Sequence, residues 1–398
     1  MIQVEEALEL FKKYTGQFGT ESIPLSEAIG RVLKEDLHTD RDLPPYDRVT
    51  MDGIAIRYVD YDSGQRIFPI AGIAAAGDPQ KKMSEPGSCM EVMTGAIMPS
   101  GYDTVIKYEE LDLVNNKVTV TADKVNKAQN IHFKGLDSKA GSKLTSKNQI
   151  IASAEIGIAA SIGRSSVKVA KLPKTIVIST GNELVPIDTT PLEHQIRKSN
   201  VYRISTALEA LKVNCQQAHL DDDKEHIRLK LEQYLDSYDL IILSGGVSKG
   251  KFDFIPAVLD ELGTTKHFHK VAQRPGKPFW FGSYKDKCHI FAFPGNPVSS
   301  FVCMHRYLID WLGHSLGAPL RQPMKAVLTE EVSFRPDLTY FLEVKISYSD
   351  SGQILATPQK GNGSGDLVNL TKGDAIIQLP RGREVFTKGG VYPVFFYR

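Results

Sequence analysis

Carboxylates, basic side chains and glycines recur in the second half of the chain, at points where strands are expected to end. In the stretch Leu240–Asp253, four apolar residues run into Ser244, Gly245 and Gly246 and then into the carboxylate of Asp253. Glycines let a backbone curl around a ligand, and the N–H groups of such a loop can cradle an oxyanion. An ordinary strand-to-helix turn has the same pattern, so this stretch alone leaves function open.

The same combination follows the other predicted strands of this region. The groups are Thr180, Gly181, Asn182 and Glu183; Asp222; Ser244, Gly245, Gly246 and Asp253; Lys270, Arg274, Pro275, Gly276 and Lys277; and Pro294, Gly295 and Asn296. In an open parallel sheet, ligands bind beyond the carboxyl ends of the strands, so we expect these groups to converge. The basic side chains suit a phosphorylated or otherwise oxyanionic ligand. Glu183, Asp222 and Asp253 offer the oxygen ligands of Mg²⁺, which points to metal-assisted cleavage or transfer at a phosphoanhydride.

Composition and motif searches exclude several function classes. The chain has no Walker loop, and Gly245–Gly246 lacks the dinucleotide fingerprint, so neither a kinase-like nor a nicotinamide-dependent reaction is supported. A formal charge of +1 lacks the basic excess of a nonspecific nucleic-acid binder. Four scattered cysteines show no metal spacing and no disulfide framework. With no signal peptide and no apolar run of about 18 residues, we expect a cytoplasmic protein without membrane partners.

A doubly wound, mostly parallel α/β domain over 173–317 would position these groups, because strands and helices alternate there. The first strand is expected at Thr175–Ser179, followed by a helix that Ser199 or Asn200 could cap. The aspartates Asp221–Asp223 precede the next helix, and capping explains at least one of them. The remaining expected elements are the strand from Leu240, a helix over 256–262, the strand Cys288–Phe293 and a long helix to about Leu312.

Three further regions complete a multidomain α/β and β architecture. Residues 1–45 and 140–172 predict a small helical N-terminal domain, with helices from Val4 and over Ser26–Leu33. Residues 46–139 predict an inserted β domain that carries Asp52 and Thr94, each of which would otherwise be explained by a local turn. Residues 318–398 predict a final β domain, with strands at 325–346, 353–358 and 391–396.

Six ordered motifs make the whole chain resemble the molybdopterin molybdenumtransferase family (MoeA type), which includes the E domain of gephyrin. They are Met51–Gly53, Met93–Ala96, Ser179–Leu184, Ser244–Ser248, Pro275–Pro278 and Pro294–Val298. The resemblance implies an elongated homodimer of four-domain subunits. Such a protein inserts molybdate into adenylylated molybdopterin and releases AMP with the help of a divalent metal, taken as Mg²⁺. The upstream partner implied is a molybdopterin adenylyltransferase.

The resemblance also implies roles for individual residues. The catalytic set is Asp52, Glu183, Asp222, Asp253, Lys270 and Arg274, of which Glu183, Asp222 and Asp253 would bind the metal. The substrate-binding set is Thr94, Asp137, Thr180, Gly181, Ser244, Gly245, Gly246, Ser248, Pro275, Gly276, Lys277, Pro294, Gly295, Asn296 and Ser364.

The chain departs from the usual family pattern at several positions, which add positive charge to the α/β domain and remove it elsewhere. The departures are Asn182, Lys198, Lys249, Lys251 and Arg274 in the α/β domain, His132 in the β insert, and Glu343 in Phe341–Glu343, where the final domain often has an arginine.

Other activities use a related α/β domain. The adenylyltransferase of the preceding step and a nicotinamide-nucleotide amidase type share it, but neither would need the β insert or the terminal β domain. A second class is a binding scaffold, as in gephyrin, or an inactive or altered-specificity paralogue. Three retained carboxylates around an anion site favour the enzyme. The sequence does not distinguish molybdate from tungstate.

Overall fold

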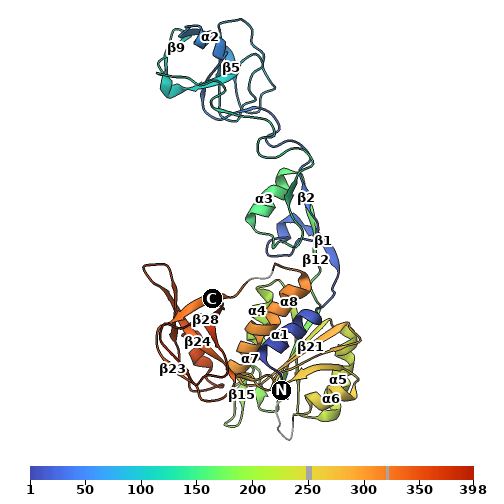
Figure 1. Cartoon of the computed structure of the whole chain (residues 1–398). Helices are drawn as coiled ribbons and strands as arrows, with labels where there is room; N and C mark the ends of the chain where they lie inside the picture. The colour runs from blue at the N-terminus through green and yellow to red at the C-terminus, as the bar shows by residue number, and fades with distance from the viewer. Residues whose placement is uncertain (248–252, 320–321) are drawn as a thin grey trace. The chain divides into compact units, whose positions relative to one another are not determined.

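The chain forms two compact units. A computed structural model describes residues 1–247, 253–319 and 322–398 (Figure 1). The first unit contains Met1–Glu35, Asn148–Ser153 and Ser166–Arg398, and the second contains Asp36–Lys147 and Ala154–Ser165. The four predicted domains are a finer division of the chain, and their boundaries stay a prediction.

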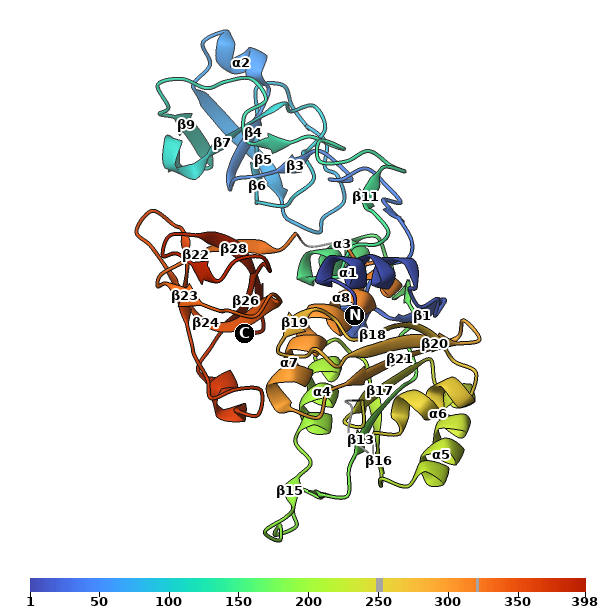
Figure 2. The same ribbon diagram turned by 60° about the horizontal axis from the view of Figure 1, so that its bottom comes forward.

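A six-stranded sheet forms the centre of the first unit. Its order is β16 (Cys215–Leu220), β13 (Thr175–Thr180), β17 (Leu240–Ser244), β21 (Cys288–Phe293), β20 (Trp280–Tyr284) and β18 (Thr265–His269). The first four strands are parallel, and β20 runs antiparallel to both of its neighbours, β21 and β18, which confirms the predicted mostly parallel sheet. Helices cover both faces (Figure 2).

Alternation along β17 explains why its sequence is apolar without a break. Leu240 and Ile242 point into a core shared with α4 (Asn200–Glu209), whereas Ile241 and Leu243 point into a core shared with α5 (Lys224–Ser237) and α6 (Ile255–Glu261). All four side chains are fully buried. A parallel strand covered on both faces must be apolar at every position, so the run Leu240–Leu243 fixes the central strand and the loop that follows it.

The N-terminal region departs from the predicted helical domain. Helix α1 (Val4–Lys13) forms as expected, but its buried residue Phe11 stacks on Phe291 of β21, so α1 packs on the α/β sheet. The helix predicted over Ser26–Leu33 is wrong. Only the 3-10 turn η1 (Leu25–Glu27) forms, because Gly30 takes a φ of 81° and Val32 and Leu33 bridge to other extended segments. Strand pairing joins this region to the later segment, through β1 (Thr20–Pro24) with β12 (Ser166–Ala170).

The C-terminal region is all β, as predicted. The strands are β22 (Met324–Leu328), β23 (Val332–Ser333), β24 (Thr339–Tyr348), β25 (Ile354–Pro358), β26 (Ala375–Leu379), β27 (Val385–Phe386) and β28 (Val391–Phe396). Pairing of β24 with both β25 and β26 closes β24, β25, β22, β28 and β26 into a barrel. The two-residue strand β19 (Gln273–Arg274), from the α/β region, pairs in parallel with β24. The helix expected to run to about Leu312 is α7 (Pro297–Cys303), a wider π turn, and α8 (Ile309–Leu316).

The second unit contains the predicted β insert. Its sheet has the order β7 (Thr104–Lys107), β4 (Gly53–Ile56), β6 (Cys89–Val92), β5 (Ile67–Ala74), β9 (Lys117–Val120) and β8 (Leu111–Val114). The short strands β3 (Arg48–Val49) and β10 (Ile131–His132) form a separate pair, as do β2 (Leu37–His38) and β11 (Lys143–Thr145). The helix α3 (Ser153–Ser161) matches the helix-like stretch read from the sequence.

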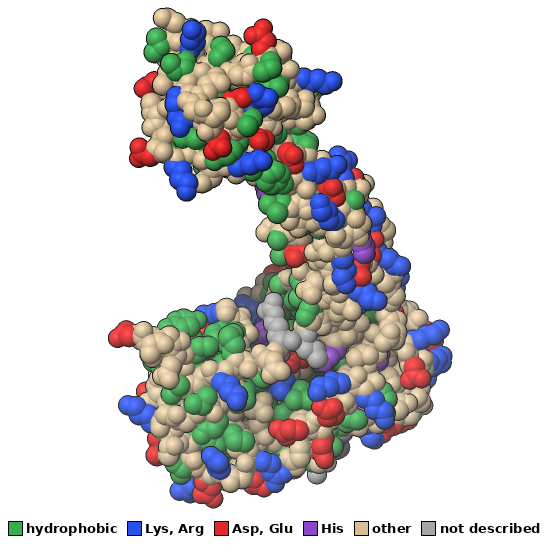
Figure 3. All heavy atoms as spheres, turned by 45° about the horizontal axis from the view of Figure 1, so that its top comes forward, with side chains coloured by type: hydrophobic (Ala, Val, Ile, Leu, Met, Phe, Trp, Pro, Cys, Tyr) green, Lys and Arg blue, Asp and Glu red, His purple; other side chains and the backbone are tan. Residues whose placement is uncertain are grey.

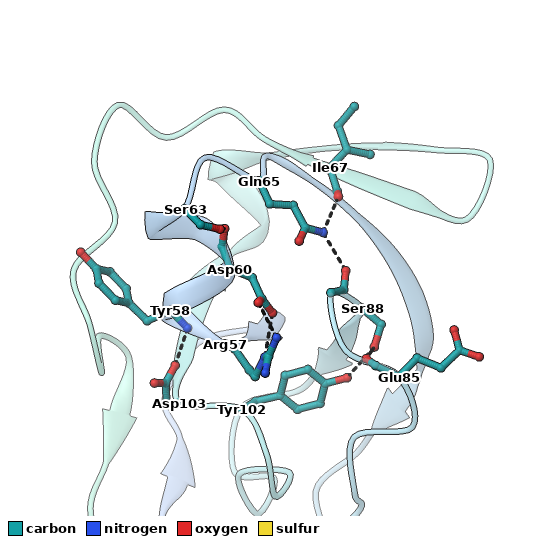
Figure 4. A network of polar contacts seen from close by, with 11 residues as sticks. Arg57, Tyr58, Asp60, Ser63, Gln65, Ile67, Glu85, Ser88, Tyr102 and Asp103 are labelled. Carbon is teal, nitrogen blue, oxygen red and sulfur yellow. Dashed lines mark hydrogen bonds and ion pairs between the residues drawn. The ribbon is translucent and has the colours of Figure 1, made fainter.

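Side-chain hydrogen bonds hold the loops of this unit around the helix α2 (Tyr58–Asp62), as Figure 4 shows. Gln65 donates to the carbonyls of Ile67 and Gly87 at 2.9 and 2.7 Å, and the Ser88 hydroxyl lies 3.1 Å from that of Tyr102. These hydrogen bonds add to the packing of the hydrophobic core that includes Tyr61 of α2.

The surface and the helices agree with the composition. On the face in Figure 3, basic and acidic side chains are interspersed, as expected for a net charge of +1. Among the described helices, none combines the length and the apolar composition that a bilayer crossing needs.

Candidate functional site

The strand order places a topological switch point between β13 and β17. The chain passes from β13 to β16 on one side and then to β17 on the other, so the carboxyl ends of β13 and β17 lie side by side. Thr180 is the last residue of β13 and Ser244 is the last residue of β17. Ligands of open α/β sheets bind at such a point. Two of the predicted glycine loops therefore start where a ligand site is expected.

Asn200 ties the loops after β17 and β21 together. Its Nδ2 donates hydrogen bonds to Ser244 Oγ at 2.9 Å and to the Gly295 carbonyl at 2.7 Å. The Gly245 N–H donates to the Phe293 carbonyl at 3.0 Å. The expected cap of α4 is wrong, because Ser199 occupies the N-cap position without a side-chain hydrogen bond and the Asn200 amide points to the loops instead.

The hydroxyl of Thr180 is buried against the glycine loop. Thr180 is only 4% exposed, and its Oγ1 has no hydrogen-bond partner among the described residues. A Cβ on Gly245, whose φ is 109°, would lie 2.5 Å from this oxygen. An unpaired buried hydroxyl is unusual and costly, so its presence here marks a position where a ligand group could bind. Ser248, the last residue of the motif, lies outside the described residues.

The acidic candidates lie after β13, after β16 and before α6. Asp222 and Asn182 exchange hydrogen bonds, with Asn182 N–H to Asp222 Oδ2 at 3.3 Å and Asp222 N–H to Asn182 Oδ1 at 3.0 Å. A Cβ on Gly181 would overlap the Glu183 carboxylate. Asp223 caps α5 by accepting the His226 N–H at 2.6 Å, so capping explains Asp223 and leaves Asp222 for another role.

The predicted metal ligands are not gathered into one cluster. Within the described residues, no group of three or more His, Cys, Asp and Glu side chains is arranged to hold a metal ion. Asp253 follows the undescribed residues 248–252, which include Lys249 and Lys251, and precedes α6, whose N-cap is Phe254. The metal site therefore stays a prediction.

His219 lies beside the acidic candidates. It is on β16, with its Nδ1 2.8 Å from Ser179 Oγ. Burial lowers its pKa, and the charge of Lys198 lowers it further. Lys198, which departs from the usual family pattern, thus lowers the pKa of a residue near the carboxyl end of β16, beside β13.

The loop 270–279 carries the basic candidates. It is closed by hydrogen bonds from the Lys270 N–H to the Phe279 carbonyl and from the Val271 N–H to the Lys277 carbonyl. The side chain of Gln273 is fully buried and stabilises the interior of this loop. It donates to the Pro275 carbonyl at 3.0 Å and accepts from the Tyr307 hydroxyl. Gln273 and Arg274 form β19. The main-chain pairing of β19 with β24 therefore fixes the position of the Arg274 backbone.

A cavity of about 580 Å³ opens between this loop, the start of α7 and the barrel. Seven predicted residues line it: Arg274, Pro275, Gly276, Lys277, Pro294, Asn296 and Ser364. Asn296 Nδ2 donates to Ser364 Oγ at 2.9 Å, and the Val298 N–H donates to the Ser364 carbonyl at 3.0 Å. The basic side chains Arg274 and Lys277 are exposed. A concave site with a few polar groups is the usual form of a small-molecule pocket.

Sequence reasoning missed several residues of this site. Phe334, Leu338, Tyr340, Phe341 and Asn369 line the cavity beside the predicted residues. Glu343 also lines it, although the sequence only marked it as the place of a missing arginine. Gln273 and Asn200 act through tertiary partners that no local pattern indicates. For Glu343 a signal was available, because it is a charged residue within the apolar run Phe341–Val344.

In the second unit, Asp52 and Thr94 are brought together. Asp52 Oδ1 accepts from the Thr94 N–H at 2.6 Å and from Thr94 Oγ1 at 2.7 Å. These bonds, that of the backbone first, lower the pKa of Asp52. The alternative that Asp52 bonds only its own turn is therefore wrong. Asp137 accepts from His132 at 2.9 Å, and the other ring nitrogen of His132 lies 3.0 Å from Arg48 Nη2.

Three family models cover nearly all of the chain. Residues 2–163 match the MoeA N-terminal region (domains I and II), residues 176–314 match a probable molybdopterin-binding domain, and residues 325–395 match the MoeA C-terminal region (domain IV).

Relatives match over the full length. The molybdopterin molybdenumtransferase of Synechocystis is 38% identical over 398 residues, covering 99% of this chain and 100% of the relative. That of Staphylococcus aureus is 30% identical, covering 98% and 94%. The crystal structure of the molybdopterin biosynthesis MoeA protein from Pyrococcus horikoshii is 27% identical, with a TM-score of 0.84 and full coverage of both chains. The fold predicted from the motifs is thereby confirmed, and the chain belongs to the molybdopterin molybdenumtransferase family.

Proposed function

We propose that this protein inserts molybdate into adenylylated molybdopterin and releases AMP. The observation that carries the proposal is the pairing, within one unit, of glycine loops at the switch point with a cavity that Arg274 and Lys277 line. The family to which the chain belongs supports the same reaction. The buried hydroxyl of Thr180 argues against a scaffold role, since it lacks the protein partner that a purely structural loop would supply.

The loops after β13 and β17 would bind the phosphates. The hydroxyl of Thr180 and the backbone N–H of Gly246 can donate to phosphate oxygens, as can the undescribed Ser248. The N–H groups of Gly181 and Gly245 already donate to the carbonyls of Leu220 and Phe293, so these two glycines would let the backbone approach the ligand closely. Ser244 is held in place by Asn200. Donors fixed before binding stabilise charge on a phosphate without reorganisation.

The basic side chains would bind the oxyanions. Arg274 and Lys277 line the cavity, and Lys270 lies at the start of their loop. A guanidinium can grip two oxygens of a tetrahedral oxyanion, which suits molybdate or a phosphate. Pro275, Gly276, Pro294, Gly295, Asn296 and Ser364 would shape the walls around the ligand.

The donor set suits Mg²⁺ chemically, because Glu183, Asp222 and Asp253 all offer hard oxygen ligands. These three would hold the ion, with Asp222 oriented by its hydrogen bonds with Asn182. When bound, Mg²⁺ supplies charge neutralisation at the phosphoanhydride that is cleaved. The chain's own residues orient the diphosphate beside it.

The family also supports a homodimer in which Asp52, Thr94 and Asp137 of one subunit complete the site of the other. A molybdopterin adenylyltransferase would supply the substrate. Mixing Asp52→Ala subunits with Asp253→Ala subunits should then restore part of the activity, because some sites receive both intact residues. A monomeric mass in light scattering at micromolar concentration, with full activity, would contradict this arrangement.

AMP release tests the reaction itself. Purified protein should release AMP from adenylylated molybdopterin only when molybdate and a divalent metal are both present, and a chelator should stop it. Release at an undiminished rate in excess chelator would remove the metal from the proposal. No release under any condition would refute the reaction.

A further inference from the structure

Glu343 faces the cavity from the barrel. Along β24, Leu342 and Val344 point into the barrel core, whereas Phe341 packs on the opposite side, in the core of the α/β sheet. Alternation places Glu343 on the same side as Phe341. Its side chain lines the cavity and is 6% exposed. A carboxyl group therefore lies deep in the same pocket that Arg274 and Lys277 enter from exposed positions.

One oxygen of this carboxyl group lacks the donor that a buried acid needs. Its Oε1 is buried and has no hydrogen-bond partner among the described residues. Burial raises the pKa of Glu343, a hydrogen bond from its own backbone N–H partly opposes that rise, and the negative charge of Asp366 adds to it. Burying a carboxylate without donors is expensive, so such a group is retained where a ligand supplies them.

Aromatic side chains also line the cavity, from the side of β24 opposite to Glu343. Tyr340 and Phe334 stack at 4.2 Å between ring centroids and both line the cavity. A volume of about 580 Å³ accommodates a fused bicyclic ring with a polar tail. The exposed cations are then available for the oxyanionic end of the same ligand.

We propose that Glu343 recognises the pterin ring of the substrate by accepting two parallel hydrogen bonds, from the ring N3–H and the 2-amino group. The proposal rests on the proposed function for the presence of a pterin. It adds which residue recognises the ring and which edge of the ring that residue contacts. A carboxylate presents two acceptors side by side, which match these two donors. Adenine, the other ring of the substrate, presents one donor beside one acceptor and does not match a carboxylate.

The substitution Glu343→Gln should change the preference of the site between pterin and its analogue lumazine. The glutamine amide keeps one acceptor but puts a donor in place of the other, so it opposes the pterin edge and matches lumazine, in which a second carbonyl replaces the 2-amino group. Binding of free pterin and of lumazine to the full-length protein can be followed by ligand fluorescence. The wild type should prefer pterin. Glu343→Gln should bind pterin at least about tenfold more weakly and lumazine more tightly.

Matched variants and ligands make the outcome decisive. Glu331→Gln, an exposed glutamate of the same region, should leave both affinities unchanged, and circular dichroism checks that each variant is folded. Equal pterin binding by wild type and Glu343→Gln would overturn the proposal, as would no pterin binding by the wild type up to about 1 mM. If Glu343→Gln instead weakens AMP binding, Glu343 serves the adenine. AMP release by the wild type reports separately on the proposed function, so the two can fail independently.

Discussion

Two candidate oxygens of the first unit lack the hydrogen bonds that the candidate carboxylates of the second unit already make. In the second unit, Asp52 accepts two bonds from Thr94, and Asp137 is bonded to His132. In the first unit, the buried oxygens Thr180 Oγ1 and Glu343 Oε1 have no partner among the described residues. Both sets were predicted from motifs or departures of the same family. In the free protein, the named oxygens of the second unit are nonetheless hydrogen-bonded and those of the first unit are not.

This difference teaches where binding energy can arise. A polar group that is already paired gains little from a ligand, because one hydrogen bond replaces another. A buried group without a partner destabilises the free protein, and a ligand that supplies the partner recovers that cost. We therefore expect the first unit to provide affinity and the second to provide an oriented carboxylate.

The largest effects on the kinetics should come from two substitutions, one at the proposed metal ligand Asp253 and one at the proposed anion-binding residue Arg274. Asp253→Ala should lower the maximal rate by about 100-fold, a loss typical of a damaged metal site, and leave the molybdate concentration for half-maximal rate nearly unchanged. Arg274→Ala should raise that concentration by about 10- to 150-fold with a smaller effect on the maximal rate, since it removes a charge-assisted bond.

Steady-state kinetics over a molybdate titration measure both quantities for both variants. Identical profiles would refute the division of labour. A wild-type profile for Asp253→Ala would return that residue to a structural role at the start of α6.

A smaller effect should appear in stability at the two ends of β13. Thr180→Val removes a hydroxyl without a partner, so it should stabilise the first unit by about 1 kcal/mol while weakening phosphate binding. Thr175→Val is the matched control, because the Thr175 hydroxyl donates to the Pro173 carbonyl at 3.0 Å and its loss should destabilise by about 1 kcal/mol. Urea unfolding and AMP binding of both variants test this. A destabilised Thr180→Val with normal AMP affinity would show that its hydroxyl is structural.

The smallest effect concerns the acid range in the second unit. The pKa of Asp52 lies below its ordinary value of 3.8, so its bonds to Thr94 stabilise the fold above that pH and are lost as the pH falls through the lowered pKa. Thr94→Val keeps the backbone bond but removes the hydroxyl, and should raise the pKa of Asp52 part of the way back. Carboxyl chemical shifts from an NMR titration measure it. An unchanged pKa would leave the backbone N–H as the sole cause.

The sequence was most informative where structure is local. The run Leu240–Leu243 predicted β17, and the alternation of strands and helices predicted the sheet and the edge at which Thr180 and Ser244 meet. The helix expected over Ser26–Leu33 failed because strand pairing overrode its periodicity. The strand β26 was not anticipated, since its place depends on closing the barrel against β24.

The site was predictable only in part for the same reason. Glycine loops and charged motifs identify themselves by type and spacing. The roles of Asn200, Gln273 and Glu343 depend on partners about 30 to 100 residues away, or on a cavity between two folded regions. Asp222 and Asp223 were equally good caps on paper, and only the contact with His226 separates them.

The parallel pairing of β19 with β24 has a consequence for how such a protein could diversify. Main-chain bonds between Gln273–Arg274 and Thr339–Tyr340 set the distance between the anion-binding loop and the wall of the pocket, whatever side chains those strands carry. The residue at position 343 can therefore be exchanged without displacing the cations. Variation at this one place in the barrel would retune which ring is accepted, while the chemistry at the oxyanion stays constant.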